Sequence, residues 1–335
     1  MEYRKLGRTG IQISEIGFGC GNVGGLMIRG EPAGQVRAAA RAVELGINYF
    51  DTASSYGDGR SERNLGRVLK ELTPNITSDI YVGTKLRLRA QDMGDIKGGV
   101  IKAVEESLER MQLKSVDLIQ LHNRVAGTRE QERELLSVED ILGEVVQGFQ
   151  ALRSQGKVRF YGITGFGETQ ALLGVVDSGA MYSVQTCYNL LNPTSGTPAP
   201  AGFDLQDFGG LINHAEAQGT GVLVIRVLAA GALTGVEERH PVAAASVAPM
   251  GTSERYSQDL GRTQRLRFLV NQGYADSLVE AAIRFPLANT GVSSVLVGYS
   301  SMEHLEDSVR WAAKGPLPSE AMAGLRDAWA QMPPA

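Results

Sequence analysis

Cysteine and histidine are scarce in this chain, and their scarcity excludes several kinds of scaffold and site. The 335 residues include only two cysteines, Cys20 and Cys187, which cannot form a disulfide framework or a metal-binding spacing. The histidines number four and are scattered along the chain: His122, His214, His240 and His304. Without a clustered ligand pattern such as H-x-x-x-H, the sequence predicts no metal site.

Long apolar runs and basic blocks are also missing. No stretch reaches 18 consecutive apolar residues, and the opening segment MEYRKLGRTG lacks the apolar centre of a signal peptide. The net charge of −4 is spread along the chain, which argues against nucleic acid and membrane partners. We therefore expect a cytoplasmic protein that acts on a small molecule. No pattern in the sequence specifies an oligomeric state.

Short apolar runs and helical stretches alternate through the sequence. Continuous apolar, β-branched runs predict eight strands, at residues 15–19, 47–51, 80–85, 116–122, 158–164, 182–188, 221–227 and 293–298. Stretches with helical periodicity, such as residues 34–46 and 99–113, separate most of them. Strands of continuous apolar character suit a parallel sheet covered on both faces, so we predict an α/β fold, a (β/α)₈ TIM barrel in one domain over residues 1–335.

Two further features complete the expected barrel. Residues 3–14 contain two short strand-like pieces around a turn at Gly10, which predicts an N-terminal β-hairpin that closes the bottom of the barrel. Residues 194–203 and 236–263 are long insertions after the sixth and seventh strands. Loops in these positions lie at the C-terminal face, where a barrel binds its substrate.

Four ionisable residues stand at or just beyond the ends of successive predicted strands. Asp51 ends the second strand, Tyr56 follows in its loop, Lys85 ends the third and His122 ends the fourth. A lysine ammonium beside a tyrosine phenol stabilises the phenolate, so the pair can exchange a proton with a substrate. We expect Asp51 to balance the charge of Lys85, and His122 to hydrogen-bond a substrate carbonyl.

Each of these residues also has an ordinary structural explanation. A strand-end Asp is often a turn former, a loop Tyr a half-exposed aromatic, a lone Lys a solvated charge, and a lone His a satisfied structural residue. The placement of all four at consecutive strand ends favours a catalytic group over four coincidences, and it indicates proton transfer coupled to hydride transfer.

A competing motif lies at residues 19–24, where GCGNVG matches G-x-G-x-x-G after an apolar run. In a dinucleotide-binding fingerprint the third glycine opens a helix directly, whereas here the first helical stretch is expected only near Pro32, so we reject a Rossmann domain. Glycine still lets the backbone approach a ligand closely, so this turn remains a candidate for ligand contact.

The segments INYFDTASSYGDGRSERNLGRVLK, YVGTK, VDLIQLH and LGRTGIQISEIGFG closely resemble the aldo-keto reductase superfamily. The resemblance covers nearly the whole chain. It implies a barrel that binds NADP(H) or NAD(H) in an extended form, with Asp51, Tyr56, Lys85 and His122 as the catalytic tetrad. It implies an NAD(P)H-dependent enzyme that reduces an aldehyde, ketone or sugar, or oxidises the alcohol. A cofactor-binding redox sensor or regulatory subunit that retains the reductase fold is the alternative.

The same resemblance implies the cofactor contacts. We expect Gly19 and Cys20, in the glycine-rich turn, to line the nicotinamide side. Where the family holds the nicotinamide carboxamide with Ser, Asn and Gln, this chain has Thr164, Gly165 and Gln185, so one amide contact is missing. The seventh strand lacks the family's stacking aromatic, and there we expect contacts from Ile225, Arg226 and Leu228, with Arg226 on the pyrophosphate.

At the adenosine end, NADP-preferring members carry Lys or Arg in the segment matching GYSSMEHLEDS, and this chain has neither there. The expected cofactor contacts in that segment are Gly298, Ser300, His304, Asp307 and Ser308. Because its acidic side chains oppose a phosphate, we predict weak discrimination between NADP(H) and NAD(H), within roughly tenfold. Arg124, just after His122, is a candidate selector of carboxylate or hydroxylated substrates.

Overall fold

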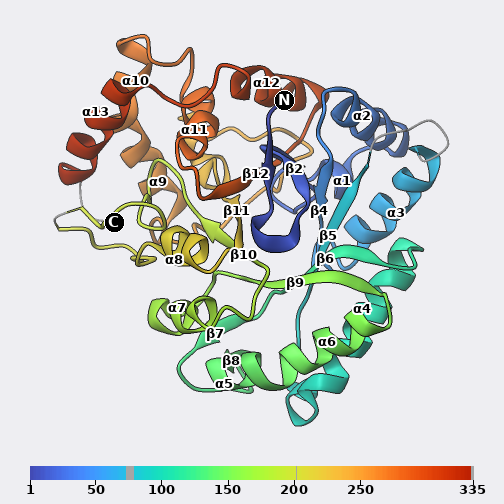
Figure 1. The fold of residues 1–335 in the computed structure, drawn as a ribbon. Helices are drawn as coiled ribbons and strands as arrows, with labels where there is room; N and C mark the ends of the chain where they lie inside the picture. Colours follow the sequence, from blue (N-terminus) through green and yellow to red (C-terminus); the bar gives the residue numbers. More distant parts are fainter. Residues whose placement is uncertain (73–78, 201, 333–335) are drawn as a thin grey trace.

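The computed structural model describes residues 1–72, 79–200 and 202–332, and its centre is a closed barrel of eight parallel strands (Figure 1). Around the barrel the strands follow the order β10-β11-β12-β3-β4-β5-β6-β9. Their bounds are β3 Ile16–Gly19, β4 Tyr49–Asp51, β5 Tyr81–Leu86, β6 Val116–Leu121, β9 Val158–Thr164, β10 Ser183–Cys187, β11 Gly221–Ile225 and β12 Val292–Gly298. All eight predicted strands are present, so the predicted (β/α)₈ barrel is confirmed and the open Rossmann sheet is excluded.

Helices surround the barrel and cover its outer face (Figure 1). Among them are α2 Pro32–Glu44, α3 Arg60–Leu72, α4 Ile96–Met111, α6 Val146–Ser154, α7 Thr169–Asp177, α8 Leu211–Ala217, α11 Leu278–Leu287, α12 Met302–Ala312 and α13 Ser319–Ala330. Their ends follow the expected sequence signals: Pro32 opens α2 at its first position, and the Asp95 carboxylate accepts a hydrogen bond from the Gly98 amide at the start of α4. The apolar faces of these helices and the outer faces of the strands form the main core.

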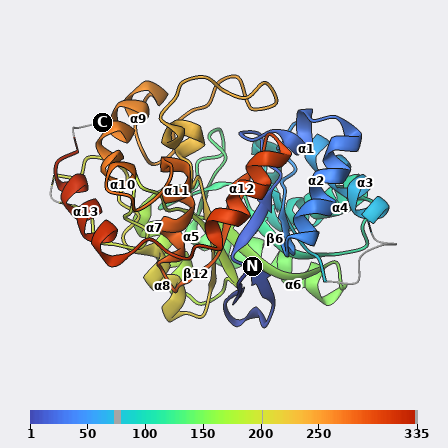
Figure 2. The same ribbon diagram turned by 90° about the horizontal axis from the view of Figure 1, so that it is seen from above.

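The predicted hairpin, β1 Tyr3–Lys5 and β2 Gln12–Ser14, closes the bottom of the barrel. Its turn packs so tightly there that a Cβ on Gly7 would lie 2.3 Å from the Gly221 amide nitrogen, and Gly7 has φ of +49°. The Arg8 guanidinium donates to the carbonyl oxygens of Gly179, Met181 and Gln218 at 2.6–2.7 Å. Figure 2 shows the hairpin at one end of the barrel and the long loop that precedes α9 Tyr256–Thr263 at the other.

The C-terminal face carries the predicted long loops, and it contains small elements that the sequence did not indicate. After β6 the chain forms a two-stranded parallel sheet from β7 Arg124–Ala126 and β8 Leu135–Ser137. Helix α1, Leu26–Arg29, begins well before Pro32, so our expectation for the first helical stretch was wrong. Four residues are too few for a helical periodicity to be recognised. No helix among the described residues is both long enough and apolar enough to cross a membrane.

Candidate active site

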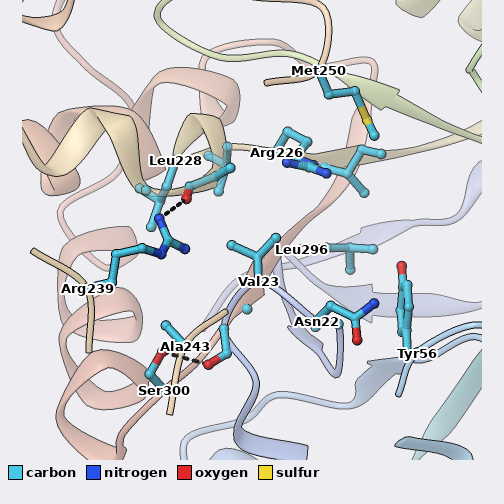
Figure 3. Close-up of a pocket in the computed structure, with 18 of the residues that line it drawn as sticks. Asn22, Val23, Tyr56, Arg226, Leu228, Arg239, Ala243, Met250, Leu296 and Ser300 are labelled. Carbon is cyan, nitrogen blue, oxygen red and sulfur yellow. Dashed lines mark hydrogen bonds between the residues drawn. The ribbon is translucent and has the colours of Figure 1, made fainter. Parts of the chain in front are cut away.

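A cleft of about 590 Å³ opens at the C-terminal ends of the barrel strands (Figure 3). Strand residues form its floor: Gly19, Asp51 and Ile225 end β3, β4 and β11, and Gln185 lies in the middle of β10. The loops after β3, β4 and β11 form its walls. The cleft therefore lies where the barrel topology predicts the reactive groups.

The backbone after β4 fixes the position of Tyr56. The Ser54 amide donates to the Lys85 carbonyl at 3.0 Å, which ties this loop to the neighbouring strand end. The chain then turns through three residues in the left-handed region, Gly57 at φ +59°, Asp58 at +53° and Gly59 at +77°. Glycine adopts this conformation without steric cost, which explains the two glycines of the SYGDG loop. The turn leaves the Tyr56 ring on the wall of the cleft.

Three of the four predicted catalytic side chains share one hydrogen-bonded group. Lys85 is fully buried, and its Nζ donates to Asp51 Oδ1, to the Thr52 carbonyl at 2.8 Å and to the Tyr56 hydroxyl at 3.3 Å. The ammonium lies 4.9 Å from the centre of the Tyr56 ring. A single cation thus contacts both the carboxylate behind it and the phenol that faces the cleft.

The fourth side chain, His122, stands beside Tyr56. The two ring centroids are 5.8 Å apart and the ring planes are nearly perpendicular, at 83°. The His122 amide donates to the Leu86 carbonyl at 2.8 Å, which holds the residue at the end of β6. The structure therefore brings the four predicted residues together at one end of the cleft, with Lys85 behind the lining and the other three on it.

Burial and neighbouring charges set the ionisation of this group. Burial opposes the charged form of Lys85, but Asp51 and Tyr56 outweigh it and hold the pKa of Lys85 above its ordinary value. Burial raises the pKa of Asp51, and the Lys85 ammonium opposes that rise. Burial, followed by Lys85 and Arg87, lowers the pKa of His122 from 6.5 to about 3. His122 is consequently a neutral imidazole throughout the physiological range.

Asp51 accepts more hydrogen bonds than its lysine supplies. Gln185 Nε2 donates to Asp51 Oδ2 at 2.7 Å, and the Tyr49 hydroxyl lies 3.4 Å from the same oxygen. Gln185 was predicted as a carboxamide contact. It does line the cleft, and in this structure its amide group donates to the Asp51 carboxylate.

The other predicted cofactor residues divide into those on the cleft and those away from it. Those on the lining are Gly19, Ile225, Arg226, Leu228, Gly298, Ser300 and His304. Cys20, Thr164, Asp307 and Ser308 are not among the lining residues. The Thr164 hydroxyl donates to the Leu121 carbonyl, and Asp307 pairs with Arg310.

The side chains of Cys20 and Ser308 face the interior of the protein, which corrects our expectation that they line the cofactor site. Cys20 is fully buried in the main core, and burial raises the pKa of its thiol. The Ser308 hydroxyl bonds the Tyr299 hydroxyl at 2.9 Å and donates to the Leu305 carbonyl at 2.8 Å. Cys20 follows the last residue of β3, and its thiol contacts the Phe18 carbonyl at 3.8 Å. Ser308 lies on the buried face of α12, which repeats every three to four residues.

The turn after β11 has an unusual backbone. Arg226, Ala229 and Ala230 have φ of +57°, +45° and +58°, and Gly231 follows at +107°. Non-glycine residues rarely adopt this region, so three of them in one turn carry strain that the surrounding contacts must offset. The buried Asn189 contributes one such contact by donating to the Arg226 carbonyl at 3.0 Å. The turn presents the Arg226 side chain to the cleft (Figure 3).

A strap formed by residues 236–250 crosses the mouth of the cleft and joins its opposite wall. The Ala244 amide donates to the Val23 carbonyl at 3.0 Å, and Arg29 Nε donates to the Val242 carbonyl at 2.7 Å. Arg239, on the strap, donates to the carbonyls of Ala230 and Ala244 at 2.9 and 2.6 Å. No carboxylate among the described residues pairs with Arg239.

Sequence reasoning missed several residues of the lining. Arg239 and Met250 come from the strap, Asn22 and Gly21 from the loop after β3, and Phe166 from the loop after β9. Loop residues have no periodicity that would predict their direction. Arg124, a candidate for substrate selection, is exposed in β7 and is not part of the lining.

Comparison with known proteins agrees with the barrel. The model of the Aldo/keto reductase family matches residues 15–330. L-galactose dehydrogenase of Arabidopsis thaliana is 32% identical over 318 residues, which cover 92% of this chain and 87% of that protein. Pyridoxal 4-dehydrogenase of Microbacterium luteolum is 24% identical over 358 residues, which cover 97% of this chain and 96% of that protein. The holo form of the aldo-keto reductase AKR11C1 from Bacillus halodurans superposes with a TM-score of 0.72 over 98% of this chain and 96% of that one, at 24% identity, which supports the fold.

A closed parallel barrel and a family match over nearly the whole chain, with named dehydrogenases among its relatives, define an NAD(P)-dependent oxidoreductase. The chain belongs to the Aldo/keto reductase family.

Proposed function

We propose that this enzyme catalyses the reversible reduction of a carbonyl compound, with Tyr56 as general acid in reduction and general base in oxidation. The observation that carries the proposal is the position of the Tyr56 hydroxyl, 3.3 Å from the buried Lys85 ammonium, on a ring that faces the cleft beside His122. The phenol gives its proton to the substrate oxygen, and Lys85 stabilises the phenolate that remains. The neutral His122 donates a hydrogen bond to the same oxygen.

The cleft suits a nicotinamide cofactor. A Cβ on Gly21 would lie 3.6 Å from the Tyr56 ring, so glycine at this position leaves the space beside the phenol free. A Cβ on Gly24 would lie 2.5 Å from the carbonyl carbon of Gly298, so glycine there allows the two backbones to pack closely in the wall of the cleft. The cofactor, when bound, supplies the hydride that reaches the carbonyl carbon. Its nicotinamide would rest against Gly19 and Ile225, near Tyr56.

Arg226 is the residue we assign to the pyrophosphate. Its guanidinium lines the cleft, and a planar guanidinium binds phosphate oxygens in pairs. Its hydrogen bond to the Ala248 carbonyl, at 3.3 Å, is long and leaves donors for a ligand. The adenosine would then extend toward Ser300 and His304.

We propose weak discrimination between NADPH and NADH, within roughly tenfold or about 1.4 kcal/mol. Ser300 donates to the Gly24 carbonyl at 2.7 Å, so its hydroxyl is already engaged. Arg239 is the strap arginine on the lining, and two of its nitrogens hold backbone carbonyls. Each charge-assisted bond to a phosphate contributes about 1.5–3 kcal/mol. Because two nitrogens of Arg239 already bond carbonyls, we expect its guanidinium to add little preference for NADPH over NADH.

Aldehydes, ketones and aldoses are the substrate classes we propose. The similarity to an L-galactose dehydrogenase makes aldoses the first to test. Asn22 lies next to Tyr56 and offers an amide that can bond a substrate hydroxyl (Figure 3). The cytoplasm is our proposed location, because both cysteines are free and buried, as suits a reducing compartment.

The test is turnover of a substrate panel with both cofactors in both directions, by wild type and by Tyr56→Phe. Phenylalanine keeps the ring and removes the proton donor, so kcat should fall roughly 10²- to 10⁴-fold while cofactor affinity changes little. Tyr3→Phe is the matched control, because Tyr3 lies on the hairpin, where its hydroxyl bonds the Gly46 carbonyl. Near wild-type kcat in Tyr56→Phe would refute the assignment.

A further inference from the structure

Ser55, the residue immediately before Tyr56, is the one described residue of the cleft whose side chain bonds the ring of His122. Its Oγ lies 3.3 Å from His122 Nδ1. Both residues line the cleft. The neighbouring Ser54 has no such bond to the ring, although its backbone follows the same loop.

This contact can determine which nitrogen of the neutral His122 ring carries the proton. Because burial, Lys85 and Arg87 keep the ring neutral, it carries one N–H and one bare nitrogen. The partner of one nitrogen decides which of the two holds the proton. Apart from the Ser55 hydroxyl, no hydrogen-bond partner contacts Nδ1 in the part of the chain described. A hydroxyl can donate to a bare Nδ1 or accept from an Nδ1–H, so the direction of this one bond sets the tautomer.

We propose that Ser55 is a positioning residue that fixes His122 as the Nε2–H tautomer. The Ser55 hydroxyl donates to Nδ1, and Nε2 then holds the N–H. The ring thereby presents a donor to a substrate oxygen and no acceptor that would repel it. This inference rests on the proposed carbonyl chemistry, and it names the residue that prepares His122 for it.

Ser55 lies in the same loop as Tyr56, so one loop both carries the general acid and contacts the His122 ring. The Ser54 amide bond to Lys85 and the Tyr56 amide bond to the Ala53 carbonyl fix the backbone on both sides of Ser55. One short segment therefore positions Tyr56, the proton donor, and sets the tautomer of His122, the second donor to the substrate oxygen.

The direct test is the ¹⁵N NMR spectrum of the His122 ring in the full-length protein, without cofactor or substrate. The chain has four histidines, so two-bond ¹H–¹⁵N correlations are few, and His122→Gln assigns the signals of interest. In wild type we expect an Nδ1 shift typical of a bare nitrogen and an Nε2 shift typical of N–H. Ser55→Ala should show a mixture of tautomers, whereas Ser55→Thr, which keeps the hydroxyl, should restore the wild-type shifts. Ser54→Ala is the matched control and should leave them unchanged.

Kinetics provide the second measurement. Loss of one neutral hydrogen bond corresponds to about a two- to tenfold effect, so Ser55→Ala should lower kcat by that factor at constant cofactor affinity, and Ser55→Thr should recover it. A wild-type spectrum with the proton on Nδ1, or a Ser55→Ala spectrum identical to wild type, would overturn the inference. Because the spectrum needs no turnover, an Nε2–H ring in a protein that reduces no carbonyl would instead reject the proposed function.

Discussion

Replacement of Lys85 by methionine tests the buried charge pair and the catalytic proposal together. The Lys85 side chain is 0% exposed and that of Asp51 is 5% exposed, so water cannot solvate a carboxylate that loses its partner. Removing one member of a buried pair typically costs about 3–5 kcal/mol. Gln185 and Tyr49 still donate to Asp51 in the variant, so we expect the lower end of that range, about 3 kcal/mol. The kcat of the variant should also fall, by roughly 10²- to 10⁴-fold, because no cation remains to stabilise the phenolate.

The assay is urea unfolding of four proteins: wild type, Lys85→Met, Asp51→Asn with Lys85→Met, and Lys157→Met. The double variant removes both charges while the introduced asparagine still offers an oxygen to Gln185, so it should regain most of the lost stability but none of the activity. Lys157 forms an exposed pair with Glu105, and its loss should cost no more than about 1 kcal/mol. If Lys85→Met costs as little as Lys157→Met, or if the double variant is no more stable than Lys85→Met, the argument for a charged buried pair fails.

Three further predictions concern pH, the cleft and the cofactor. The pKa of His122 is lowered to about 3 in the folded protein, whereas the unfolded chain takes up this proton near pH 6.5. The free energy of unfolding should therefore fall as the pH drops from about 6.5 to 3. His122→Gln should make this fall shallower in acid unfolding curves. Gly21→Ala places a methyl group 3.6 Å from the Tyr56 ring, so KM for bulky carbonyls should rise severalfold while that of the smallest aldehydes stays near wild type; an equal rise for all would contradict the position of the ring. Dissociation constants for NADPH and NADH, from quenching of protein fluorescence, should agree within roughly tenfold; a hundredfold preference for NADPH would refute weak discrimination, and Arg226→Ala and Arg239→Ala would show which guanidinium is responsible.

The barrel, and the gathering of Asp51, Tyr56, Lys85 and His122 at one face, could be predicted because both follow from topology. Every parallel strand in a closed barrel ends at the same face, so residues at strand ends converge even when they are far apart in sequence. Asp51, Lys85 and His122 needed no information on side-chain direction beyond that rule, and Tyr56 needed only a short loop.

Residues off the strand ends needed side-chain directions that we did not derive. Ser308 could have been recognised as a core residue, because Leu305, Ser308, Val309 and Ala312 form the buried stripe of α12 at helical spacing. Arg239 could not have been found in this way. It reaches the cleft because the strap is bonded to Val23 and Arg29 across the mouth, and no local pattern encodes contacts between such distant segments.

The hairpin at the bottom of the barrel has a consequence for how the chain folds. Its arginines bind carbonyls that come much later in the sequence: Arg8 binds those of Gly179, Met181 and Gln218, and Arg4 binds those of Leu287, Asn289 and Val292. Contacts between such distant residues form slowly, since the intervening chain must first be ordered. The hairpin can therefore make these bonds only once residues 179–218 and 287–292 are in place.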